Sequence, residues 1–124
     1  MQLDESAILW SAPERERAGR PLIVLLHGYG SHEGDLFSLS PRLPLAATVA
    51  SLRGPIKESA GYAWWSLAGQ NPGQPDPAAV DAGAQAVLDW LDTVDYTTVA
   101  LLGFSQGAAL SLQLNRLAPD RFAA

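Results

Sequence analysis

The sequence predicts an α/β fold, in which a mostly parallel sheet carries helices on both faces. Three short apolar runs, LIVLL, LAATVASL and TVALL, are typical of strands that are buried on both faces of such a sheet. A helical pattern separates the second run from the third, and a strand, a helix and a strand in this order need a crossover that makes the strands parallel. With 124 residues, 48% hydrophobic and 17% charged, the chain can bury the core of one domain.

The first half of the chain alternates apolar runs with polar connections. LIVLL begins directly after Pro21 and ends at a glycine-rich turn, as a strand bounded by turn signals does. A helix after this turn should stop before Pro41, because proline disrupts the hydrogen bonding of a helix interior. We therefore expect a short strand over residues 6–10, a solvated connection over 13–20, a strand over 22–26, a short helix over 33–39 and a strand over 45–52.

The second half holds the clearest helix, which follows a long surface loop over residues 54–77. Loops of this length inside a compact domain are usually functional or mobile. Asp76 suits the N-cap of the helix and Pro77 its first position, so we interpret Asp76 as a cap and not as a catalytic acid. Apolar residues then recur at spacings of four and three and form one stripe, opposite an acidic and solvated face: Val80, Ala84, Val87, Leu91 and Val94. A strand over 98–102 and a helix over 108–117 complete the pattern.

Composition and charge exclude several classes of protein. The chain has no cysteine, which removes disulfides, thiol catalysis and cysteine-ligated metals. Eight basic and thirteen acidic residues give a net charge of −5, which disfavours binding to nucleic acid. No apolar run approaches the ~20 residues of a membrane span, and the N-terminus is acidic where a secretory signal would be basic. We expect a soluble, cytoplasmic protein with no transmembrane segment and no nucleic-acid partner.

The strongest chemical signal is GFSQG, residues 103–107, between the last predicted strand and the last helix. In this G-x-S-x-G pattern the chain turns sharply, which strains the serine backbone, and glycine two residues to either side avoids a collision. The hydroxyl of Ser105 would then stand exposed beside a helix N-terminus, whose amides favour developing negative charge. The alternative is an ordinary strand-to-helix turn built from small residues; the strand–turn–helix context favours a nucleophile.

A second signal, HGYG at residues 27–30, follows the strand over 22–26. Such a turn can aim backbone N–H groups at a carbonyl oxygen, so the amides of Tyr29 and Gln106 are candidates for a two-donor oxyanion hole. Each such donor is typically worth about 3 kcal/mol in the transition state. The alternative is a turn with no catalytic role, which the serine motif downstream makes less attractive.

The two histidines are not assigned a catalytic role. His27 precedes Ser105, whereas with a nucleophile turn of this kind the acid and then the histidine follow the serine. A hydrogen-bonded structural role for His27 and an exposed position for His32 are expected. No metal-ligand spacing is present, and no cofactor is predicted.

Three aromatic residues cluster in the long loop: Tyr62, Trp64 and Trp65. Aromatic side chains bring large apolar areas to binding sites, so Trp64 and Trp65 could wall an acyl pocket. Equally, they could anchor the loop on the core, and the sequence leaves both interpretations open.

Together these motifs resemble the phospholipase/carboxylesterase family of α/β hydrolases, which includes the acyl-protein thioesterases. The similar segments are LIVLLHGYGSHEGDL (22–36), SLRGPIKESAGYAWWSL (51–67) and VALLGFSQGAALSL (99–112). The resemblance implies a serine hydrolase that acts on a small ester, lysophospholipid or thioester. It maps the nucleophile onto Ser105 and the oxyanion donors onto Tyr29 and Gln106, and it places the tryptophan loop near the acyl site.

One departure from the family pattern concerns the base and the acid. Family members carry an Asp and then a His after the nucleophile, but here nineteen residues follow Ser105, with Asp120 as the single acid and no histidine. Further strand–helix–strand units of ~30 residues each would be needed, roughly 60–90 residues in all. We therefore expect an incomplete α/β-hydrolase fold, the N-terminal part of a hydrolase forming one domain over 1–124, nearly inactive alone and prone to associate through an exposed sheet edge.

Two other functions fit part of this sequence. A truncated, non-catalytic scaffold that serves binding or dimerisation fits the missing residues, but it would have no need of a strained serine. A nucleotide-binding domain fits the fold class, but the sequence has neither a P-loop nor a G-x-G-x-x-G motif after a strand.

Overall fold

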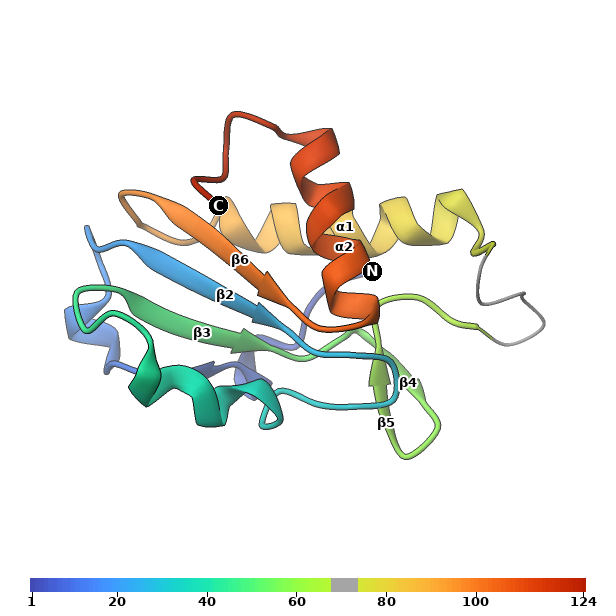
Figure 1. Ribbon diagram of the computed structural model, residues 1–124, viewed down its shortest axis with the longest axis horizontal. Helices are drawn as coiled ribbons and strands as arrows, with labels where there is room; N and C mark the ends of the chain where they lie inside the picture. Colours follow the sequence, from blue (N-terminus) through green and yellow to red (C-terminus); the bar gives the residue numbers. More distant parts are fainter. Residues whose placement is uncertain (68–73) are drawn as a thin grey trace.

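A computed structural model, which describes residues 1–67 and 74–124, has a four-stranded sheet at its centre (Figure 1). The strands are β1 (Leu9–Trp10), β2 (Leu22–Leu26), β3 (Thr48–Leu52) and β6 (Val99–Gly103), in the spatial order β1-β3-β2-β6. The ladders that join β2 to β3 and to β6 are parallel, and β1 pairs antiparallel with β3. The predicted α/β class with a mostly parallel sheet is therefore confirmed.

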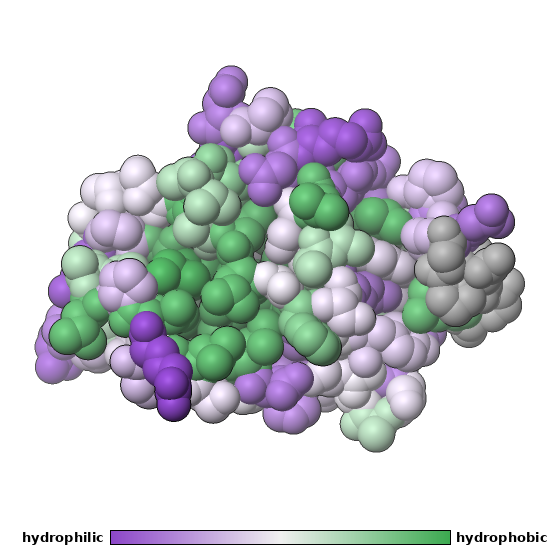
Figure 2. All heavy atoms as spheres, in the orientation of Figure 1, coloured by the Kyte–Doolittle hydropathy of each residue, from purple (hydrophilic) through white to green (hydrophobic). Residues whose placement is uncertain are grey.

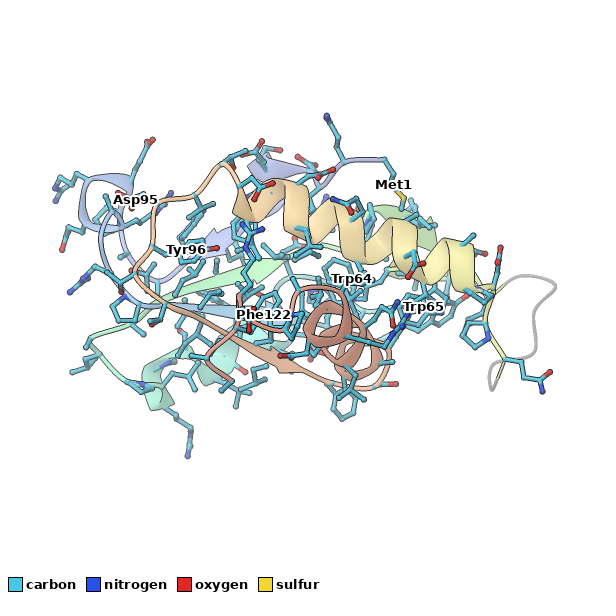
Figure 3. The ribbon with its side chains drawn as sticks, turned by 90° about the horizontal axis from the view of Figure 1, so that it is seen from above. Met1, Trp64, Trp65, Asp95, Tyr96 and Phe122 are labelled. Atoms are coloured by element: carbon cyan, nitrogen blue, oxygen red, sulfur yellow. The ribbon has the colours of Figure 1, made fainter. Side chains whose placement is uncertain are left out.

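Both α-helices pack on one face of the sheet. Leu22, Val24 and Leu26 alternate along β2, and all three belong to the same buried cluster as apolar residues of α1 (Pro77–Leu91) and α2 (Gln106–Leu117). In the view of Figure 3 the two helices lie over the strands. Asp76 caps α1 by accepting a hydrogen bond from the Ala78 amide at 3.1 Å, as predicted.

Among the described residues, the helical element on the other face of the sheet is the short 3-10 helix η3 (Leu36–Arg42). Leu25 and Val49 are buried on this side, whereas Ile23, Ala100 and Leu102 are only half-buried. Figure 2 shows hydrophobic side chains gathered over β2 and β6 on this side of the molecule. The prediction of helices on both faces therefore holds in an uneven form, with the long helices together and η3 opposite them.

Register brings the ends of the central strands to one edge. Leu26 pairs with Leu52 of β3 and with Gly103 of β6, so the connections that leave β2 and β6 start side by side. The Phe104 amide donates to the Leu26 carbonyl at 3.1 Å and ties the two connections together. The HGYG and GFSQG motifs, about 75 residues apart in the chain, become neighbours through this pairing.

Several local elements differ from the sequence prediction. The predicted helix over 33–39 is η3, which begins at Leu36 and runs through Pro41, because a 3-10 turn tolerates a proline that an α-helix interior does not. The long loop contains a hairpin of β4 (Ile56–Glu58) and β5 (Gly61–Ala63), and its residues 68–73 lie outside the described part. Short 3-10 turns, η1 (Glu5–Ala7) and η2 (Glu14–Glu16), flank β1.

The edge of β6 that faces away from β2 is partly paired. The Leu101 amide donates to the Ala124 carbonyl at 2.9 Å, and the Ala123 amide donates to the Val99 carbonyl at 2.8 Å. Residues 123 and 124 thus run beside the strand whose edge was expected to be exposed. Association through this edge stays a prediction.

Candidate active site

Ser105 stands at the turn from β6 into α2 in a backbone conformation that L-residues rarely adopt, with φ 56° and ψ −115°. The residue is exposed, and its hydroxyl makes no capping hydrogen bond to α2. Such backbone strain costs of the order of 1–3 kcal/mol and persists only where the surrounding structure enforces it. On the strand side of this turn, the end of β6 is paired with the end of β2, Gly103 with Leu26.

The two glycines of the motif allow backbone segments to touch. A Cβ atom on Gly107 would lie 1.9 Å from the Leu26 carbonyl oxygen, and one on Gly103 would lie 2.3 Å from the Gly107 carbonyl oxygen. Both distances are far below any contact that a carbon atom can make. The steric reason inferred from the sequence is therefore present at both positions.

The connection after β2 passes directly beside Ser105. A Cβ on Gly28 would lie 3.3 Å from the Ser105 Cβ. Gly30 has φ 77°, which favours glycine, and its amide donates to the Tyr62 carbonyl at 2.8 Å. The Tyr62 amide in turn donates to the Ser31 carbonyl at 2.8 Å, so the hairpin β4–β5 supports the HGYG turn from outside.

The amides of Tyr29 and Gln106 belong to the two chain segments that meet at Ser105. Gln106 is the first residue of α2, and Tyr29 lies one residue after Gly28. In the part of the chain that the structure describes, neither amide has a hydrogen-bond acceptor. Two unengaged donors beside an exposed serine at a helix N-terminus can stabilise an oxygen that acquires negative charge.

His27 is buried and both of its ring nitrogens are engaged. Nδ1 lies 2.7 Å from the Gly28 carbonyl, to which it donates, and Nε2 accepts from the Gly54 amide at 2.9 Å. This pair of partners fixes the neutral tautomer with the proton on Nδ1, and burial lowers the pKa of the imidazole. The ring is therefore a structural group, as expected, and has no free nitrogen to activate Ser105. His32 is exposed.

Trp64 and Trp65 lie in the core, between α1 and α2 in the view of Figure 3. Their exposed fractions are 0% and 4%, so neither ring offers a surface to a substrate in this arrangement. This burial fits the second interpretation that the sequence left open, in which both rings anchor their loop on the core. A role as substrate-contacting residues stays a prediction.

Glu58 is a site neighbour that sequence reasoning missed. Its carboxylate accepts hydrogen bonds from the Tyr29 and Ser66 hydroxyl groups. The hydrogen bond from Ser66, and to a smaller extent the one from Tyr29, lowers the pKa of the Glu58 carboxyl. The same bond to Glu58 raises the pKa of the Tyr29 hydroxyl. A single glutamate in a predicted surface loop gives no signal of such a contact, because the hairpin that delivers it to Tyr29 was not predicted.

An ion pair fixes the start of the segment after HGYG. Arg53 donates from Nε and Nη2 to the two carboxylate oxygens of Glu33 at 2.8 and 2.7 Å, and its guanidinium lies 4.3 Å from the centre of the Tyr62 ring. The Ser51 hydroxyl also donates to the Glu33 carbonyl at 2.5 Å. These contacts hold the HGYG connection against β3 and the hairpin.

Replacing Glu33 by glutamine is expected to lower the free energy of unfolding by about 2 kcal/mol at neutral pH. The Arg53 guanidinium lowers the pKa of the Glu33 carboxyl from 4.5 to about 2. A lowered pKa in the folded state contributes stability above pH 4.5, and this contribution disappears as the pH falls toward 2. Urea unfolding of both proteins between pH 7 and pH 2.5 should show the difference shrinking with acidity. A difference that does not change with pH would contradict the role of this ion pair.

Within residues 1–67 and 74–124, no three His, Asp or Glu side chains are placed to hold a metal ion. No helix in the same described ranges combines the length and apolar character that a bilayer crossing requires.

Several of the known proteins that this chain resembles are described as esterases. The family model described as phospholipase/carboxylesterase matches residues 11–123. NocK of Nocardia uniformis subsp. tsuyamanensis, described as a candidate esterase, is 34% identical over 108 residues, which are 85% of this chain and 31% of that protein. A carboxylesterase structure from Mesorhizobium loti superposes with a TM-score of 0.72 at 26% identity, over 85% of this chain and 52% of its own.

A second similar structure is that of an acyl-protein thioesterase. Acyl-protein thioesterase 2 of Zea mays superposes with a TM-score of 0.65 at 27% identity, over 86% of this chain and 49% of its own. The chain thus spans about half the length of these structures and about a third of NocK.

Proposed function

Because this chain belongs to the phospholipase/carboxylesterase family of α/β hydrolases, we propose that Ser105 is the nucleophile of a carboxylic ester or thioester hydrolase. One observation carries the proposal. The exposed Ser105 hydroxyl sits in a strained turn beside two amides, of Tyr29 and Gln106, that have no acceptor among the described residues.

The reaction follows from this geometry. The Ser105 oxygen attacks the substrate carbonyl while its proton passes to a general base, and the carbonyl oxygen becomes an oxyanion that accepts from the Tyr29 and Gln106 amides. Collapse of this intermediate breaks the ester or thioester bond: the alcohol or thiol leaves with the proton from the general base, and the acyl group stays on Ser105. Water then gives a proton to the base and attacks the acyl group, the Ser105 oxygen takes that proton back, and the carboxylic acid leaves.

The general base and its acid partner are proposed to come from residues outside these 124. No histidine follows Ser105 within them, and both nitrogens of His27 are already engaged. Ser105 without a base is a weak nucleophile, so the 124 residues alone are expected to turn over esters slowly. The acyl-protein thioesterase among the similar structures supports including thioesters in the substrate class.

A fluorophosphonate probe is expected to label Ser105 in the product of the complete reading frame. The probe carries an electrophilic phosphorus and places a developing oxyanion where the two amides can bind it. Ser105→Ala should lose the label, whereas Ser111→Ala should keep it, because the Ser111 hydroxyl is committed to the Gly107 carbonyl within α2 at 2.9 Å. Peptide mapping by mass spectrometry identifies the labelled residue. A folded protein that stays unlabelled at Ser105 would overturn the proposal.

A further inference from the structure

The Gln106 side chain links the start of α2 to the tryptophan loop. Its carboxamide oxygen accepts from the Trp64 amide at 2.8 Å, and its Nε2 donates to the Trp65 carbonyl at 2.9 Å. The residue is buried, so these two bonds satisfy a carboxamide that water does not reach. The residue whose backbone amide is one candidate oxyanion donor is thereby fixed to the backbone at positions 64 and 65.

The Trp64 indole links the same loop to the HGYG turn. Its N–H donates to the His27 carbonyl at 2.8 Å, two residues before Tyr29, and the two rings pack with their centres 5.2 Å apart. α1 also packs closely against the Trp64 backbone: a Cβ on Gly83 would lie 2.6 Å from the Trp64 carbonyl oxygen. Trp64 has 0% exposure, so these neighbours enclose it.

We propose that Trp64 is a positioning residue that sets the separation of the Tyr29 and Gln106 amides. One residue bonds to both sides of the site, through its backbone amide to the Gln106 side chain and through its indole to the His27 carbonyl. The Tyr29 and Gln106 amides can both donate to one oxyanion only while the HGYG turn and the start of α2 keep the separation that these bonds set. This inference rests on the proposed function, since it assigns Trp64 a part in the same oxyanion hole.

Two substitutions break the link at different bonds. Trp64→Phe removes the indole N–H and keeps the backbone bond to Gln106, and Gln106→Met removes both carboxamide bonds and keeps the backbone donor. Misplacing a group by about 1 Å can cost 100-fold in rate. For the product of the complete reading frame, we expect both variants to lower kcat for an ester 10- to 100-fold and to change KM less than about threefold.

A thionoester substrate separates an oxyanion defect from a general loss of structure. Its sulfur is a weak hydrogen-bond acceptor and gains less from the two amides than oxygen does. Thionoester turnover should therefore fall less than about threefold in the same variants. Trp90→Phe is the matched control: it shrinks a buried indole that packs against the Trp10 ring, and both activities should persist. Circular dichroism checks that each variant is folded at the assay temperature.

The outcomes are distinguishable. A wild-type protein that hydrolyses neither substrate overturns the proposed function and this inference with it. If the wild type is active but both Trp64→Phe and Gln106→Met behave as Trp90→Phe does, only the inference fails. Equal losses on ester and thionoester also overturn it, because they indicate a loss of folded protein and not of oxyanion stabilisation.

Discussion

Replacing Ser105 by glycine is expected to abolish ester turnover and to stabilise the fold at the same time. Without the hydroxyl no acyl-enzyme can form, and kcat of the product of the complete reading frame should fall by roughly 10⁴- to 10⁶-fold. The positive φ of 56° that strains serine is favourable for glycine, which relieves about 1–3 kcal/mol. The extra freedom of glycine in the unfolded chain takes back about 0.5–1 kcal/mol. A net gain of about 1 kcal/mol in the free energy of unfolding should remain, measurable by urea titration.

Ser105→Ala separates the two effects. Alanine also lacks the hydroxyl, so turnover should be lost to the same degree, but it keeps a Cβ and with it the strain. Because the Ser105 side chain makes no capping bond, its loss removes no contact of α2, and stability should stay within about 0.5 kcal/mol of wild type. Glycine and alanine variants of equal stability would show that the turn is not strained.

Replacing Gly107 by alanine is expected to destabilise the protein by roughly 3 kcal/mol or more. The new methyl would meet the Leu26 carbonyl at 1.9 Å and the His27 carbonyl at 2.7 Å, and both are backbone atoms that cannot rotate away. If α2 moved away from β2 to relieve this clash, the hydrogen bond from the Phe104 amide to the Leu26 carbonyl would also be disturbed. Alanine gains about 1 kcal/mol of helix propensity over glycine, too little to offset such a clash.

Gly34→Ala serves as the control for this substitution. Gly34 has an ordinary φ, and a methyl there meets the end of the exposed His32 side chain at 3.1 Å. The His32 ring accepts from the Gly34 amide at 3.0 Å, and because this bond is exposed, water can replace it if the ring shifts. Its stability should change by less than about 0.5 kcal/mol. Thermal unfolding followed by circular dichroism compares both variants with wild type. A Gly107→Ala protein as stable as Gly34→Ala would contradict the close approach of α2 to β2.

Local sequence signals predicted the central elements well. The run LIVLL corresponds to β2 with both boundaries correct, and Asp76 with Pro77 marked the start of α1. These signals work because a strand buried on both faces needs an unbroken apolar run, and a helix start needs a side-chain acceptor and no N–H at its first position. The strand predicted over 45–52 was too long by three residues, since residues 45–47 lie in the turn before β3.

Contacts between segments that are far apart in the chain could not be predicted from the sequence. The hairpin β4–β5 is short and half-polar, so its residues carry no strong periodic signal, and its existence depends on pairing with the HGYG turn at Ser31 and Tyr62. The burial of Trp64 depends in the same way on Gly83 of α1 and on the Gln106 side chain. The link from Glu58 to Tyr29 also follows from the hairpin.

The sequence by itself determined the fold class, the exposed serine turn and the need for its two glycines, because these depend on apolar runs and on steric limits within a few residues. Only the tertiary structure decided which groups meet around Ser105. Parallel pairing of β2 with β6 brings the HGYG and GFSQG turns together, and Trp64 bonds to the His27 carbonyl on one side and to the Gln106 side chain on the other. Such meetings depend on strand register and on the packing of residues far apart in the chain, and no local pattern of residues encodes either.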